Sequence, residues 1–318
     1  MTMRRIVILD DIERAALTHG PWSRLGADWQ VDAIDRHLEG DDLVEALRDA
    51  EVIVAMRERT PLGREQIAAA GRLRLLVTTG MRNAAIDVAA AKERGIVVCG
   101  TRSLVSSAAE LAWALILASA RRIVESAESV RSGEWGGELG VDLAGRTLGI
   151  VGLGGIGQRV ARVARAFDMD VLAWSHNLAA ETAAEQGARR VDKAELFAAA
   201  DIVTIHLRLS DRTVGLVGAA ELAAMKDTAI LVNTSRGPIV REAALLAALQ
   251  AGSIGGAALD VYDTEPLPPD HPFRTGAGLL ATPHIGYVTA GNFGQYFADA
   301  VENIAAWEAG EPVRVLSA

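Results

Sequence analysis

The segment Thr147-Leu-Gly-Ile-Val-Gly-Leu-Gly-Gly-Ile-Gly157 decides the fold. Its first five residues have the apolar composition of a buried β-strand, and the residues after Gly157 have helical composition. Between a strand and a helix, the G-x-G-x-x-G spacing of Gly152, Gly154 and Gly157 is typical of a dinucleotide-binding turn. The first glycine allows the tight turn, the second admits a pyrophosphate, and the third lets helix and strand pack closely. Free N–H groups at the helix N-terminus would bind the anion, so Gly155 and Ile156 join the predicted cofactor site. The alternative is a glycine-rich turn without a ligand.

Cofactor preference depends on the end of the next predicted strand, residues 171–174. An acidic residue there would bind the ribose hydroxyls of NAD, but the strand is followed by Ser175-His176-Asn177. The missing carboxylate removes a charge that would repel a 2′-phosphate, and Ser175 is a candidate hydrogen-bond donor to one. Arg189 and Arg190 are candidates to complete an NADP site. The sequence therefore leaves both NAD and NADP open.

Short aliphatic runs alternate with Ala-rich helical stretches, which predicts the α/β class with parallel sheets covered on both faces. The predicted strands are 5–9, 52–55, 75–78, 97–99, 147–151, 171–174, 202–205, 230–233, 256–259 and 278–281. The predicted helices include 41–50, 63–70, 158–167, 219–225 and 241–251. Ser107-Ala-Ala-Glu110 has a capping-box pattern, and the apolar residues after it predict a wholly buried helix near the domain seam. The glycine-rich stretch 133–140, which carries Trp135, is predicted to be an exposed loop or arm.

The composition limits the partners. The 318 residues suffice for two domains, and 32 Lys plus Arg against 41 Asp plus Glu give a net charge of −9. This charge argues against nucleic acid or an anionic membrane as the main partner. The longest apolar stretch, 111–120, is half a membrane span. A single cysteine, Cys99, allows neither an internal disulfide nor a thiolate metal cluster, so we expect no metal and a cytoplasmic location.

A second group of polar residues lies in the later half of the chain. Arg236, then Asp260 with Glu265, and finally His284 each come shortly after a predicted strand. Ligands of open α/β sheets bind beyond the carboxyl ends of the strands. Each residue alone would be an ordinary polar loop residue. Together, beside a dinucleotide turn, they predict a site that binds a carboxylate and transfers a proton.

These motifs in this order resemble the D-isomer-specific 2-hydroxyacid dehydrogenases, whose members include phosphoglycerate, glycerate, lactate and formate dehydrogenases. The resemblance covers nearly the whole chain, and its segments are 79–87, the Gly152 loop, 233–237, 260–266 and 283–286. It implies two doubly wound parallel-sheet domains around a cleft. A flavodoxin-like substrate domain would comprise residues 1–101 plus 288–318, and a Rossmann-like dinucleotide-binding domain residues 102–287. It also implies a homodimer formed through the nucleotide domain, with the arm reaching the partner.

The resemblance implies a role for each site residue. His284 would be the general acid that protonates the carbonyl of a 2-keto acid, and the base in the reverse direction. Glu265 would hydrogen-bond His284 and favour its protonated form, and Arg236 would bind the substrate carboxylate. Asp260 would accept a hydrogen bond from the nicotinamide carboxamide. The other cofactor-binding residues would be Ser175, His206 and Thr234.

The first domain is expected to complete the substrate site. Backbone amides around Gly80 and Met81 would hold the other side of the carboxylate. Arg57 or Arg59 would either read a second anionic group of the substrate or be solvated loop residues, and the sequence leaves both open. The expected activity is the NAD(P)-dependent interconversion of a small 2-keto acid and its D-2-hydroxy acid.

Two other functions use the same fold. One is a dinucleotide-sensing binding protein or co-repressor, which the Arg236, Glu265 and His284 set disfavours without excluding. The other is a formate- or phosphite-type dehydrogenase. Formate enzymes of this family carry Gln before the catalytic His, and here Pro283 stands in that position.

Overall fold

The computed structural model describes residues 3–317, which form two compact units. Among the described residues, the first unit comprises 3–104 and 288–317, and the second comprises Val105–Tyr287. Each unit is built on a parallel sheet of its own. The predicted α/β class with two parallel-sheet domains is therefore confirmed.

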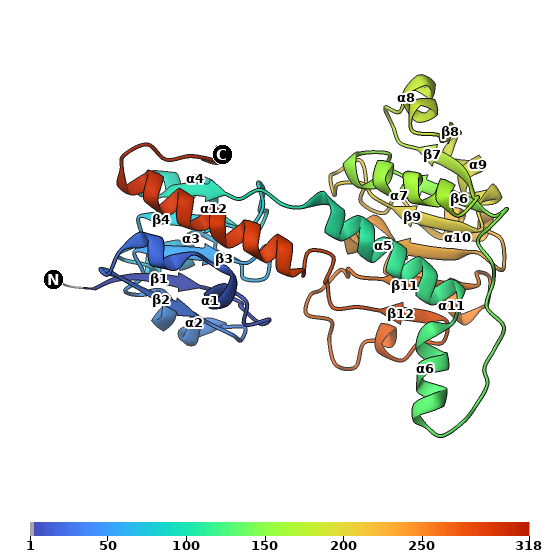
Figure 1. Ribbon diagram of the computed structural model, residues 1–318, viewed down its shortest axis with the longest axis horizontal. Helices are drawn as coiled ribbons and strands as arrows, with labels where there is room; N and C mark the ends of the chain where they lie inside the picture. The colour runs from blue at the N-terminus through green and yellow to red at the C-terminus, as the bar shows by residue number, and fades with distance from the viewer. Residues whose placement is uncertain (1–2, 318) are drawn as a thin grey trace. The chain divides into compact units, whose positions relative to one another are not determined.

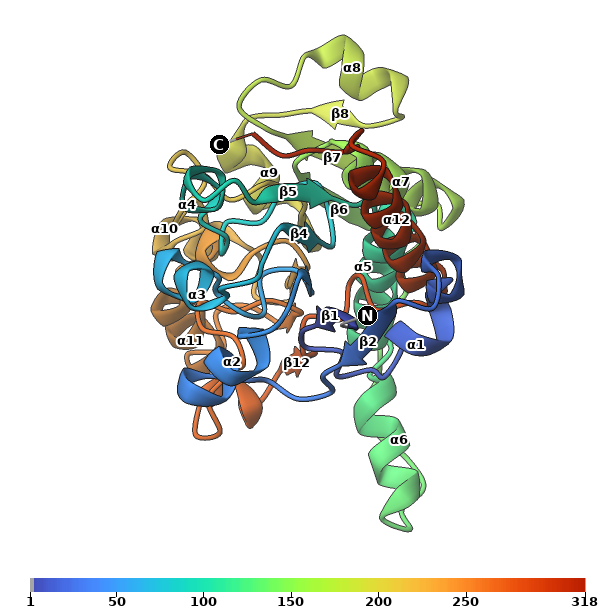
Figure 2. The same ribbon diagram turned by 90° about the vertical axis from the view of Figure 1, so that its left-hand side faces the viewer.

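The first unit is a five-stranded sheet with helices on both faces. The strand order is β2-β1-β3-β4-β5, with β1 at Arg4–Ile8, β2 at Trp29–Ala33, β3 at Val52–Ala55, β4 at Leu75–Thr78 and β5 at Val97–Gly100. The helices are α1 Ala16–His19, η1 Trp22–Leu25, α2 Gly40–Leu47, α3 Arg64–Ala69, α4 Val88–Glu93 and α12 Ala290–Glu308. Figures 1 and 2 show α2, α3 and α4 on one face and α1 and α12 on the other. Strands β3 and β4 are buried throughout, as expected for inner strands of such a sheet.

The second unit is a seven-stranded parallel sheet in the order β12-β11-β10-β9-β6-β7-β8. Its strands are β6 Thr147–Val151, β7 Asp170–Trp174, β8 Arg189–Arg190, β9 Ile202–Ile205, β10 Ile230–Asn233, β11 Gly256–Leu259 and β12 Leu279–Ala281. Its helices are α5 Val105–Ala120, α6 Ile123–Arg131, α7 Gly155–Ala166, α8 Ala180–Glu185, α9 Lys193–Ala199, α10 Ala219–Ala224 and α11 Glu242–Gln250, with short η2 Gly237–Ile239 and η3 Pro272–Arg274. Apolar residues of α5 and α7 form one core, and those of α9, α10 and α11 form another. The sheet is therefore doubly wound.

The division between the units falls three residues later than the sequence predicts. Residues 102–104, expected in the second domain, belong to the first unit. The backbone N–H and the guanidinium of Arg102 both donate to Asp299 of α12. The backbone N–H of Leu104 donates to the Asn292 side chain, also on α12. These hydrogen bonds tie the segment to the C-terminal helix.

Three local predictions are wrong, and two strands have no counterpart among the predicted ones. Ser107 is no helix cap, because α5 already begins at Val105, and Ala114 is exposed, so α5 is not wholly buried. Helix α7 begins at Gly155 rather than at residue 158, because the last glycines of the turn already adopt helical conformation. Strands β2 and β8 lack the apolar run that would have predicted them.

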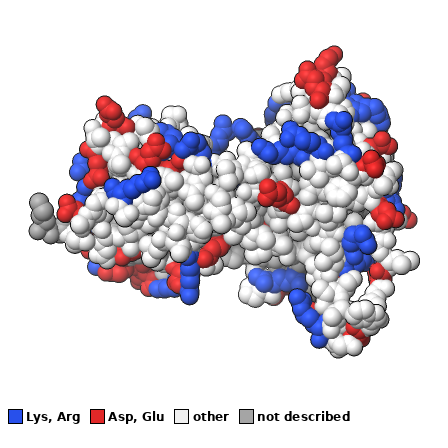
Figure 3. Space-filling model, in the orientation of Figure 1, with Lys and Arg blue, Asp and Glu red and all other residues white. Residues whose placement is uncertain are grey.

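The surface is mixed in charge, and it carries one protruding segment. Residues 132–142 after α6, which we call the arm, are all exposed and include the stretch 133–140 predicted to be an exposed loop or arm. On the face shown in Figure 3, acidic and basic side chains are interspersed, and Lys and Arg gather over α7, where Arg159, Arg162 and Arg165 are exposed. Among residues 3–317, no helix combines the length and the apolar character needed to cross a membrane.

Candidate active site

Six strands of the second unit end at the same level. Their last residues are register partners along the sheet: Trp174, Val151, Ile205, Asn233, Leu259 and Ala281. The loops that leave them therefore start side by side. The residues that open these loops are Ser175, Gly152, His206, Thr234, Asp260 and Thr282. Register thus brings residues more than a hundred positions apart in the sequence to one edge of the sheet.

The glycine loop has the shape of an anion cradle. Gly152 has a φ of +104°, and a Cβ there would lie 2.7 Å from the carbonyl oxygen of His206. At Gly157 a Cβ would lie 2.2 Å from the carbonyl oxygen of Gly152. Gly154, by contrast, faces open space, with nothing within 4 Å of an added Cβ. Helix α7 starts at the next residue without a side-chain cap, so its first N–H groups are available to a pyrophosphate.

The loops after β10 and β9 add polar groups beside this cradle. The hydroxyl of Thr234 is buried and makes no hydrogen bond to any described residue. A buried hydroxyl without a partner is costly, and a polar group of a bound cofactor would satisfy it. The imidazole of His206 contacts Thr204 Oγ1 at 2.9 Å, and burial lowers the pKa of His206 to about 4. Its ring is therefore neutral, and these residues fit a dinucleotide.

Arg236 is presented by a turn that its neighbours fix. The Asn233 side chain accepts a hydrogen bond from Ser235 N–H and donates one to the Arg236 carbonyl, both at 3.0 Å. At Gly237 a Cβ would lie 2.1 Å from the carbonyl carbon of Tyr262. Only glycine permits this approach, which packs the Arg236 turn against the loop that carries Glu265.

Glu265 and His284 form a hydrogen-bonded pair. Glu265 Oε2 lies 2.5 Å from His284 Nδ1, and Glu265 Oε1 accepts from Tyr262 N–H at 2.9 Å. The two side chains keep 34% and 23% of their surface exposed, so a ligand can reach them. With Nδ1 engaged by the carboxylate, Nε2 is the nitrogen that can exchange a proton with a bound substrate. A positioned His with a carboxylate partner is suited to general acid–base chemistry.

Asp260 holds the loop that carries His284. Its carboxylate accepts hydrogen bonds from Thr282 Oγ1 at 2.6 Å and from the N–H groups of Ile285 and Gly286, each at 2.8 Å. Burial raises the pKa of Asp260, and these donors oppose the rise. His284 itself has a φ of +54°, a left-handed conformation that costs on the order of 1 kcal/mol for a non-glycine residue. The three hydrogen bonds to Asp260 stabilise the loop in this conformation.

In the first unit, the Gly80 turn follows β4. Gly80 has a φ of +97°, and its N–H donates to Thr101 Oγ1 at 2.8 Å. The Gly80 amide is thus already engaged. The N–H of Met81 makes no hydrogen bond to any residue that the structure describes, so Met81 is the better placed of the two to bind a carboxylate.

The two arginines that follow β3 differ in their surroundings. Arg59 donates to both carboxylate oxygens of Glu13, at 2.6 and 3.0 Å, and to the Asp10 carbonyl at 2.8 Å. Arg57 instead reaches the Gly80 turn, where Nη1 donates to the Thr79 carbonyl at 3.2 Å. A Cβ at Gly80 would lie only 2.1 Å from this Nη1. Arg57 therefore lies at the predicted substrate turn, and Arg59 is held in a structural ion pair.

The residues considered for the adenosine ribose lie at the sheet edge formed by β7 and β8. Ser175 is half-buried directly after β7. Arg190 pairs in register with Ala173, near the carboxyl end of β7, and its guanidinium lies 3.4 Å from Asp192. Arg189 is paired with Glu195 at 2.8 Å. Arg190 is thus nearer than Arg189 to the end of β7.

No group of three His, Cys, Asp or Glu side chains within residues 3–317 is arranged to hold a metal ion.

Comparison with known proteins gives a consistent family. Residues 113–286 match the model of the NAD binding domain of D-isomer specific 2-hydroxyacid dehydrogenases. The chain is 42% identical over 255 residues to a glyoxylate reductase of Aeropyrum pernix, covering 77% of this chain and 76% of that protein.

Two phosphoglycerate enzymes are also similar. A D-3-phosphoglycerate dehydrogenase of Archaeoglobus fulgidus is 39% identical over 282 residues, which is 86% of this chain but only 52% of that longer protein. A crystal structure of a phosphoglycerate oxidoreductase from Vibrio cholerae superposes with a TM-score of 0.91 at 36% identity, covering 97% of this chain and all of that one. The chain belongs to the D-isomer specific 2-hydroxyacid dehydrogenases, a family of nicotinamide-dependent oxidoreductases.

Sequence reasoning missed the residues that support the site. Asn233 fixes the Arg236 turn, and Tyr262 ties its loop to the next strand end by donating from its hydroxyl to the Thr282 carbonyl at 2.9 Å. Burial raises the pKa of Tyr262, which therefore keeps its proton. The glycine directly after Arg236 was a signal of close packing, but the sequence does not say what packs there.

Proposed function

We propose that this protein catalyses the reversible, NAD(P)-dependent reduction of a small 2-keto acid to its D-2-hydroxy acid. The Glu265–His284 pair carries the proposal, because it places a carboxylate-supported imidazole at the strand ends that also present Arg236. Family membership supports the same class of reaction, and the glyoxylate reductase relative supports a small keto acid as substrate.

Each residue has one task in this reaction. Arg236 binds the substrate carboxylate, which its planar guanidinium matches. The Gly152 loop and Thr234 would hold the dinucleotide, which when reduced would supply the hydride for carbon 2 of the substrate. His284 gives the proton on Nε2 to the carbonyl oxygen as the alkoxide develops, and Glu265 stabilises the imidazolium before that transfer. In the reverse direction His284 takes the hydroxyl proton.

The test is a spectrophotometric assay of nicotinamide oxidation with glyoxylate, hydroxypyruvate, pyruvate, phenylpyruvate and 2-ketoglutarate, each with NADH and with NADPH. We expect His284→Gln to lower kcat by about 10²–10⁴-fold, the usual contribution of general acid catalysis, with little change in cofactor affinity. Arg236→Ala is expected to raise KM for the keto acid and also to lower kcat. Unchanged turnover in His284→Gln would remove the role assigned to that residue.

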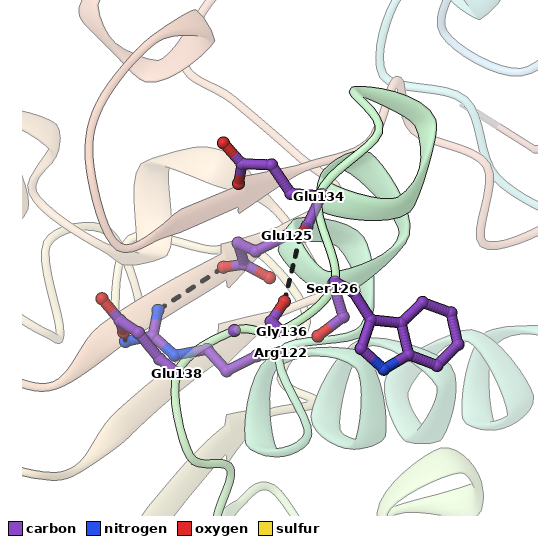
Figure 4. A pocket seen from close by; sticks show the side chains of 9 residues that line it. Arg122, Glu125, Ser126, Glu134, Gly136 and Glu138 are labelled. Carbon is purple, nitrogen blue, oxygen red and sulfur yellow. Dashed lines mark hydrogen bonds and ion pairs between the residues drawn. The ribbon is translucent and has the colours of Figure 1, made fainter.

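We further propose that the protein forms a homodimer through the arm, residues 132–142. Two apolar side chains of the arm are almost fully exposed, Trp135 at 93% and Leu139 at 96%. An open pocket of about 440 Å³ lies between the arm and α6, and Figure 4 shows Arg122, Glu125 and Glu138 among the residues that line it. A second copy would bury the two apolar side chains. Sedimentation velocity should give a dimer for the wild type and a weaker one for Trp135→Ser/Leu139→Ser.

We also propose a cytoplasmic location. The only cysteine of the sequence, Cys99, is buried, and burial raises its pKa to about 11, so the thiol is unreactive. A chain without disulfides suits a reducing compartment. Fractionation of cells that express the protein tests this.

A further inference from the structure

We propose that Glu58 makes the substrate site selective for 2-keto acids that carry a single negative charge. It does so by neutralising Arg57 beside the Gly80 turn. The inference rests on the proposed function, and it gives that function a substrate class. It concerns only residues of the first unit.

Arg57 is built into the turn rather than extended into solvent. Its backbone N–H donates to Thr79 Oγ1 at 2.8 Å, and its carbonyl accepts from the Asn83 side chain. Arg57 also has a φ of +51°, so its backbone follows an unusual path toward the turn. Its guanidinium lies against Gly80, directly before the Met81 amide. A substrate held by that amide would present its carbon chain near this cation.

Glu58 lies on the same guanidinium. Its Oε2 is 3.6 Å from Arg57 Nε, and the two side chains keep only 29% and 18% of their surface exposed. Reduced solvent contact makes the charges of such a pair less screened than those of surface residues. The other charged side chains close in sequence do not replace this effect, because Arg59 is paired with Glu13 and Arg82 is exposed to water.

The pair changes which substrates the turn accepts. An unpaired arginine beside a carboxylate-binding amide would attract a second carboxylate or a phosphate, because the guanidinium fork matches both. Arg57 and Glu58 together carry no net charge, and a second anionic group of the substrate would also meet the Glu58 carboxylate. Specificity is then gained by repelling the competitor, while a neutral or hydroxyl-bearing chain is unaffected.

The experiment compares keto acids of equal chain length that differ in charge. The pairs are 2-ketobutyrate with oxaloacetate, 2-ketovalerate with 2-ketoglutarate, and hydroxypyruvate with phosphohydroxypyruvate. For each pair, the ratio of kcat/KM for the dianionic or phosphorylated member to that for the monoanionic member is measured. We expect a ratio well below one for the wild type and a rise of about tenfold or more in Glu58→Gln, as for loss of a like-charge contact. The ratio is internal to each variant, so partial loss of folded protein does not affect it.

Two further variants make the result specific. Arg57→Gln/Glu58→Gln removes both charges and should return the ratio toward the wild-type value. Glu93→Gln removes a carboxylate that pairs with Arg64 at 2.5 Å at the end of α4, away from the carboxyl ends of the strands, and should leave the ratio unchanged.

The outcomes separate the two proposals. If the wild type reduces monoanionic keto acids but Glu58→Gln leaves the ratio unchanged, the role of Glu58 is overturned and the proposed function stands. A wild type that prefers the dianionic or phosphorylated member also overturns it. If the wild type reduces no keto acid with either cofactor, both proposals fail.

Discussion

Replacing Gly237 by Ala tests whether the active-site loops are packed as described. The added Cβ would lie 2.1 Å from the carbonyl carbon and 2.2 Å from the oxygen of Tyr262, and 2.6 Å from Asp263 N. These are backbone atoms, so no side chain can rotate out of the way. Ordinary contact begins at 3.4 Å, and the two loops must therefore separate by about 1.3 Å. One of them carries Arg236 and the other carries Glu265.

The displacement sets the expected magnitude. Overpacking of this kind destabilises a protein by about 1–3 kcal/mol. In a domain of this size, that corresponds to a fall in Tm of about 2–4 °C for each kcal/mol. A misplacement of ~1 Å in catalytic geometry can cost about 10²-fold in rate. We therefore expect Gly237→Ala to lower kcat/KM for the keto acid by about 10²-fold, with a much smaller change in cofactor affinity.

Steady-state kinetics, thermal denaturation and titration with NADH or NADPH measure these three effects. The control is Gly71→Ala, because an added Cβ at Gly71 meets nothing within 4 Å and the residue has no positive φ. It should match the wild type in kcat. A Gly237→Ala enzyme with wild-type kcat/KM and an unchanged Tm would show that the two loops do not pack at this point.

Three other changes have defined outcomes. Gly152→Ala should weaken cofactor binding by about tenfold or more in a fluorescence titration, because of its positive φ and the nearby His206 carbonyl. Asp260→Asn should lower the free energy of unfolding by about 1–3 kcal/mol in urea denaturation. The amide NH2 group that replaces one carboxylate oxygen would face a group that now donates a hydrogen bond to Asp260, and it cannot accept that bond. Burial would raise the pKa of Asp299, but the hydrogen bonds from Arg102 outweigh it and the net pKa is lowered. The hydrogen bonds from Arg102 therefore add to the free energy of unfolding at neutral pH, and this contribution is lost as the pH falls through the lowered pKa of Asp299. Arg102→Met should make the free energy of unfolding fall less steeply with acid, measured from pH 7 to about pH 2.

The inner strands of both sheets could be predicted from sequence because their signal is local. Strand 52–55 and residues 230–232 of β10 are continuous aliphatic runs, which only a sheet covered on both faces can bury. The same reasoning placed polar residues at the carboxyl ends of the strands, and the strand register brings those ends to one level. Edge strands gave no such signal. Strand β8 consists of Arg189 and Arg190 alone, and it exists because β7 offers it a backbone edge.

Contacts between loops could not be predicted, because they depend on residues far apart in the sequence. The sequence left Arg57 and Arg59 equivalent, and only the positions of Glu13 and Gly80 distinguish them. The expected carboxylate site at Gly80 and Met81 also depends on a contact with a residue far away in the sequence. The hydroxyl of Thr101, some twenty residues later, engages the first amide and leaves the second available.

The loop after β11 controls His284 at two points. Asp260, at the start of this loop, accepts hydrogen bonds from the backbone N–H groups that follow His284. Glu265, five residues later, accepts a hydrogen bond from the imidazole itself. The first contact holds the left-handed backbone and the second orients the ring. Because both contacts come from one loop, and Gly237 sets where that loop lies, the position of the imidazole depends on the packing of two neighbouring loops more than on its own strand.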